Sequence, residues 1–96
     1  MIRTVYVIMD TLAATLVGGL HLFITDAQAI RFFGDLCSDQ QTYIARHIKD
    51  HTLVKLGEID ETTGVITPFV APHTVITGEQ WQAAQQPSEP KLALEA

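Results

Sequence analysis

The segment from Thr52 to Pro68 constrains the fold of this 96-residue chain most, because it predicts a β-hairpin. Bulky and β-branched residues fill positions 52–59, which is typical of a strand. A polar turn follows at 60–64, where Gly64 is free to adopt a positive φ. Residues 65–67 begin the returning strand, and Pro68 either ends it or places it at an edge of the sheet.

Two more strands are predicted near the start of the chain. The β-branched and aromatic run at 5–9 indicates a buried strand, and 20–24 is a second run of this kind. Residues 10–14 form the connection, and Gly18-Gly19 supplies a turn or bulge before the second run. We expect the two runs to pair as a hairpin with a long loop.

Two capping boxes predict two helices in the middle of the chain. Thr25 with Gln28 begins the first, and apolar residues then recur at helical spacing at Ile30, Phe33 and Cys37. The segment 38–41 has the same capping pattern, so we expect the second helix to begin there.

These elements predict a small single α+β domain in the order β-β-α-α-β-β, with an antiparallel sheet packed on helices. We expect a core domain at 1–70. Residues 71–96 form an extension, with a short helix at 80–86 and a disordered tail at 87–96.

Charge limits the surfaces that a polyanion could contact. The net charge is −5, and the acidic excess lies in residues 58–96, whereas residues 1–57 are balanced. A nucleic-acid contact is therefore expected in the first half. Its candidate residues are Arg31, Arg46, Lys49 and Lys55, with Tyr43 stacking on bases. The alternative is an ordinary solvated face with a core tyrosine.

The single cysteine, Cys37, permits no intrachain disulfide, which fits a reducing compartment. On an apolar helix face it is expected to be a small core residue rather than a nucleophile. The apolar stretch 5–24 is interrupted by Asp10 and Gly18-Gly19, so no membrane span is expected.

No pattern predicts catalysis or a cofactor. His47 and His51 have a metal-ligand spacing, but no third ligand is evident, so a solvated or capping pair is favoured. Asp35 and Asp39 lie near expected helix ends, where carboxylates have structural roles. We therefore expect neither an enzyme nor a metal site.

Three segments in order resemble the small nonstructural protein of gokushoviruses, which are single-stranded DNA phages of the Microviridae. They are the helix 26–36, the strand 50–60 with Thr63-Gly64, and the early strand 5–10 ending in Asp. The family pattern reads A-I-R-x-F-x-D in the helix and L-x-x-L-G-x-x-D-x-x-T-G in the hairpin. The likeness covers about residues 4–70.

The resemblance implies an accessory protein that assists genome synthesis or packaging in the host cell cytoplasm. Its expected partners are single-stranded DNA or phage replication and packaging proteins. The alternative is a protein-interaction adaptor or minor virion component without DNA binding, which the acidic second half and an expected exposed region around Trp81 favour. Unpaired sheet edges also allow a homodimer.

Overall fold

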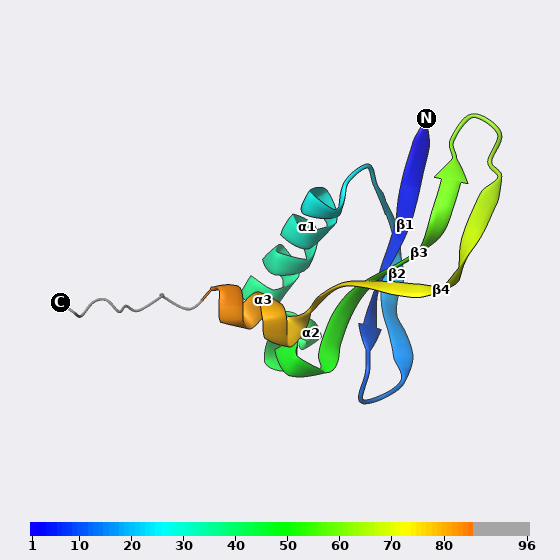
Figure 1. The fold of residues 1–96 in the computed structure, drawn as a ribbon. Coiled ribbons are helices and arrows are strands. Elements are labelled where there is room, and N and C mark those ends of the chain that lie inside the picture. Colours follow the sequence, from blue (N-terminus) through cyan, green and yellow to red (C-terminus); the bar gives the residue numbers. More distant parts are fainter. Residues whose placement is uncertain (86–96) are drawn as a thin grey trace.

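The computed structural model describes residues 1–85 and confirms the α+β prediction. Its antiparallel sheet has four strands in the order β2-β1-β3-β4, and the helices lie to one side of it (Figure 1). The elements are β1 (Ile2–Asp10), β2 (Thr15–Phe23), α1 (Asp26–Ser38), α2 (Tyr43–Arg46), the 3-10 helix η1 (Ile48–Asp50), β3 (His51–Asp60), β4 (Ile66–Thr77) and α3 (Gly78–Ala84).

The core lies between the helices and the two central strands. Because side chains alternate along a strand, Tyr6 and Ile8 of β1 reach the same side as Leu53 of β3. The buried cluster contains Tyr6, Ile8, Ala29, Phe33, Cys37, Ile44 and Leu53. Within residues 1–85 no helix is long and apolar enough to cross a membrane.

The predicted hairpin is present as β3 and β4. Gly64 has a φ of +78°, and its amide donates to the carbonyl of Asp60 at 2.7 Å. β4 occupies an edge of the sheet, as Pro68 indicated, but it continues through residue 70 to Thr77. The expected boundary at residue 70 thus lies inside β4. The pairing of β4 with β3 is interrupted between Pro68 and His73.

The first two strands pair as expected, but their loop is short, since β1 ends at Asp10 and β2 begins at Thr15. Of the turn or bulge expected at the glycine pair, the structure shows a bulge, and it lies inside β2. Tyr6 pairs with His21 while Ile8 pairs with Val17, and Gly18 has a φ of +74°.

The capping box of Thr25 and Gln28 is confirmed at the start of α1, but the predicted start of the second helix was wrong. Residues up to Ser38 still belong to α1, and α2 begins only at Tyr43. Thr42 caps it instead, because its hydroxyl oxygen accepts from the Ala45 amide at 2.9 Å.

The short helix expected at 80–86 is observed as α3, whereas the predicted tail at 87–96 lies outside the described residues. Trp81 is only partly exposed and packs against the core, so it is not the exposed surface that the sequence suggested. Its indole lies against Gly34 of α1, where an added Cβ would lie 2.7 Å from Nε1. α3 is therefore docked on the domain.

We predict that Gly57→Ala lowers the free energy of unfolding by about 1–3 kcal/mol, a typical cost of overpacking. A Cβ at Gly57 would lie 2.5 Å from the Thr67 carbonyl oxygen and 2.7 Å from the Pro68 Cα, and both belong to backbone. Urea denaturation measures the change. Gly19→Ala is the control, because its Cβ would meet open space and should change stability by less than about 0.5 kcal/mol. Equal effects would contradict the close approach of β3 and β4.

We also predict that the Cys37 thiol is almost inert in the native protein. The side chain is buried on α1, and burial raises the pKa of this thiol to about 11. The thiolate fraction thus falls about hundredfold relative to the ordinary thiol, in addition to the loss of access. Reaction with a disulfide reagent at pH 8 should be slow in buffer and fast in urea. Similar rates in both solvents would show that the Cys37 side chain is not buried in the core between α1 and the sheet.

Candidate functional site

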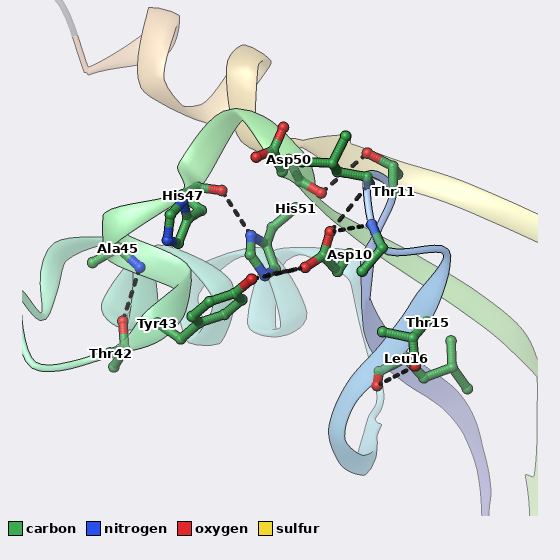
Figure 2. Close-up of polar contacts among 12 residues, drawn as sticks. Asp10, Thr11, Thr15, Leu16, Thr42, Tyr43, Ala45, His47, Asp50 and His51 are labelled. Atoms are coloured by element: carbon green, nitrogen blue, oxygen red, sulfur yellow. Dashed lines mark hydrogen bonds and ion pairs between the residues drawn. The ribbon is translucent and has the colours of Figure 1, made fainter.

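Asp10 connects three parts of the domain at the end of β1. Its Oδ1 accepts from the Leu12 and Ala13 amides at 3.1 and 3.0 Å, which fixes the turn into β2. Its Oδ2 accepts from the Tyr43 hydroxyl at 3.3 Å and lies 3.9 Å from His51 Nε2 (Figure 2). The carboxylate is almost fully buried, so these contacts replace the water that it would otherwise bind.

His51, the first residue of β3, is fully buried beside Asp10. Its Nδ1 lies 2.7 Å from the carbonyl oxygen of His47. Because a carbonyl only accepts, Nδ1 carries the proton and donates it. The distance from Nε2 to Asp10 Oδ2 is too long for a hydrogen bond, and Nε2 is buried without a hydrogen-bond partner in residues 1–85.

Tyr43 places an aromatic ring over this pair. It lies edge-on to His51, with ring centroids 5.4 Å apart, and packs against His47 at 4.7 Å. The negative charge of Asp10 raises the pKa of the Tyr43 hydroxyl. The residue as a whole remains 51% exposed.

The same region fixes η1 in place. The Thr11 amide donates to the Asp50 carbonyl oxygen at 2.8 Å, and the Thr11 hydroxyl donates to it at 3.0 Å (Figure 2). On the other side, the start of α3 packs so closely that a Cβ on Gly78 would collide with the Ile48 carbonyl oxygen. A short 3-10 helix is thereby held between the β1–β2 turn and α3.

An open hollow of about 420 Å³ lies over α2, η1 and α3. Arg46 and Lys49 line it together with His47, Asp50 and Gln82. Both cations are exposed, and neither forms an ion pair with any residue in 1–85. The hollow is thus basic, although Asp50 offsets part of its charge.

The structure separates the other two predicted cations from this hollow. Arg31 is exposed on α1 and does not line the hollow. Lys55 Nζ lies 3.2 Å from Asp26 Oδ2, so it already has an anionic partner. Asp26 also accepts from the Tyr6 hydroxyl at 2.5 Å. Burial and Asp26 together raise the pKa of Tyr6 to about 12.

The histidine pair does not have the geometry expected for a shared site. His51 is buried with Nδ1 committed to the His47 carbonyl, whereas the His47 side chain is exposed. Over the described part of the chain, no three His, Cys, Asp or Glu side chains are grouped to hold a metal ion.

The Asp10–His51 pair was the feature that sequence reasoning missed. Its signal was the alternation within 5–10, which places Asp10 on the same face as Tyr6 and Ile8. A carboxylate on the buried face of a strand needs a partner, and residue 51 is its register partner on β3.

We predict that Asp10→Asn flattens the acid limb of the stability curve. Hydrogen bonds from Ala13, then the charge of His51 and the Tyr43 hydroxyl, hold the Asp10 pKa below its ordinary value despite burial. A carboxyl with a lowered folded pKa stabilises the protein above its unfolded pKa, about 3.9, and this stability is lost as pH falls through the folded pKa. The asparagine retains the turn acceptor but not the charge.

The measurement is the urea midpoint of both proteins between about pH 5 and 2. Asp35→Asn, which removes an exposed carboxylate of α1, is the control and should preserve the wild-type slope. An unchanged slope for Asp10→Asn would refute the role of this charge.

Comparison with known protein families identifies the family of this chain. The model of the family described as Phage ORF5 protein matches residues 3–81, which is most of the chain. Neither a curated protein nor a solved structure matches it. The chain belongs to the Phage ORF5 protein family.

Proposed function

We propose that this phage protein is a non-enzymatic accessory protein that assists the synthesis or packaging of a single-stranded DNA genome by weak contact with the DNA. The observation that carries the proposal is the hollow in which Arg46 and Lys49 lie together without ion pairs in residues 1–85. The likeness of residues 26–36 and 50–60 to the gokushovirus protein is the reason for choosing single-stranded DNA and the host cytoplasm.

The chemistry of the hollow suits one or two phosphates rather than a long tract. Arginine and lysine neutralise phosphate charge, and the exposed ring of Tyr43 next to His47 offers a face on which a base can stack. The net charge of −5 and the carboxylate of Asp50 oppose this attraction. Binding should therefore be weak and strongly dependent on salt.

We predict that Arg46→Ala weakens binding to a labelled oligo-dT strand, measured by fluorescence anisotropy at low salt. Removing one cation that neutralises a phosphate should reduce the slope of log K against log salt by about 0.7 for single-stranded DNA. Arg46→Ala with Lys49→Ala should reduce it by about 1.4, twice that amount.

Arg31→Ala is the matched control, since it removes the same charge from another exposed helix position. It should leave the slope of log K against log salt unchanged, because Arg31 does not line the hollow and neutralises no phosphate there. Absence of binding at tens of micromolar, or equal losses of affinity for Arg31→Ala and Arg46→Ala, would remove the hollow as the DNA site.

The second candidate function is that of a protein-interaction adaptor or minor virion component. The observation that favours it is a hollow on the sheet that is lined only by apolar residues, among them Leu20, Leu22 and Ile66. Mass spectrometry of purified virions, with pull-down from infected cells, tests it. Absence from particles together with the lack of any phage protein partner would defeat it.

A further inference from the structure

We propose that the face of the sheet opposite the helices binds a second copy of this chain. A sheet usually buries its apolar faces against other elements. Here α1, α2 and α3 lie on one side of the strands (Figure 1). On the other side, Val5 and Val7 of the central strand β1 are buried, but Leu20 and Ile66 on the outer strands remain exposed.

This outer face carries an apolar hollow of about 260 Å³. Across the sheet, Leu22, Val5, Gly57 and Pro68 lie side by side in register. Leu20 flanks them on β2 and Ile66 on β4, and all of the lining residues are apolar. Leu20 is 58% exposed and Ile66 is 61% exposed, so the monomer leaves large aliphatic side chains in water.

The chemistry of the hollow excludes charged and hydrogen-bonding occupants. None of its lining side chains is a hydrogen-bond donor or a cation, so the hollow itself offers nothing to neutralise a phosphate. It lies on the face of the sheet across all four strands and not along an open edge, so an added peptide strand would find no ladder there. The occupant must present aliphatic side chains.

The chain itself supplies such a projection beside the hollow. Between Lys55 and Gly57 of β3, the opposing strand advances from His73 to Pro68, so residues 69–72 project from the ladder. Val70, in this bulge, is fully exposed two residues from the hollow. A twofold contact joins the same patch of both copies, so an exposed aliphatic side chain two residues from an apolar hollow would allow each copy to fill the other.

The charges at the rim also fit a twofold contact. Arg3 is the register partner of Ile59, which lines the hollow, and Arg3 Nε lies 2.7 Å from Glu61 Oε2. Each copy thus presents one cation beside one anion, so two copies can meet without net repulsion at this point. A strongly charged partner would gain nothing there.

A stable dimer buries about 800 Å² on each partner, which is more than the hollow alone provides. Leu16 extends the apolar face along β2, because it pairs with Met9 on the same side of the sheet as Val5. The proposed interface therefore covers the outer side of β2, the hollow and the bulge of β4.

Sedimentation velocity between about 1 and 200 μM tests the proposal, because mass action makes the dimer fraction rise across such a range if Kd lies within it. The wild type should sediment as twice 10.6 kDa at the upper end. Leu20→Glu and Ile66→Glu should each raise the dissociation constant at least about tenfold, since each would bury an unpaired carboxylate. Circular dichroism confirms that each variant is folded, and one folded variant suffices.

Leu12→Glu is the matched control, because Leu12 is 79% exposed in the β1–β2 turn, outside the hollow. It should dimerise like the wild type, and dimerisation should persist at high salt, unlike DNA binding. A monomeric wild type at 200 μM, equal weakening by Leu12→Glu, or a persistent dimer in both folded hollow variants would overturn the proposal. These outcomes leave the DNA proposal unaffected, since it depends on Arg46 and Lys49.

Discussion

The contacts of the buried Asp10 carboxylate hold together the end of the domain that contains the β1–β2 turn, α2 and the start of β3. The carboxylate fixes the β1–β2 turn through two amides, holds the Tyr43 ring of α2, and faces His51 at the start of β3. His51 in turn donates to the carbonyl of His47, which ends α2. Helices this short are not stable alone, so α2 and η1 depend on these contacts with the strands and on the packing of α3 against η1.

Local sequence signals predicted which helices and strands form better than they predicted the residues at which these elements begin and end. The hairpin turn at Gly64 and the cap at Thr25 depend on nearby residues, and both were correct. The predicted start of α2 was wrong because the position of its cap, Thr42, depends on packing against α1. The Thr42 hydroxyl donates to the Leu36 carbonyl oxygen of α1. Asp10 and His51 are 41 positions apart, and without the register of β1 on β3 nothing in the sequence joins them.

The predicted cations show the same limit of sequence reasoning. The distribution of charge along the sequence placed Arg31, Arg46, Lys49 and Lys55 in one group, but a common surface needs three-dimensional proximity. The backbone turn between α2 and η1 brings Arg46 and Lys49 together, whereas Lys55 faces Asp26 near the opposite end of α1. A charged side chain in a strand often has a partner on the covering helix, which removes it from the set available to a ligand.

The two proposed surfaces lie on different parts of the domain and would reinforce each other. The basic hollow belongs to α2 and η1 on the helical side, and the apolar hollow belongs to the outer face of the sheet. A twofold contact through the sheet would leave the basic hollows of both copies free on one dimer. A flexible DNA strand that reached both basic hollows would bind the second hollow at an effective concentration in the millimolar range. Two weak sites could then give an avidity far above the affinity of either site alone. The affinity of this acidic protein for DNA would then rise with its own concentration, because mass action controls the fraction of dimer.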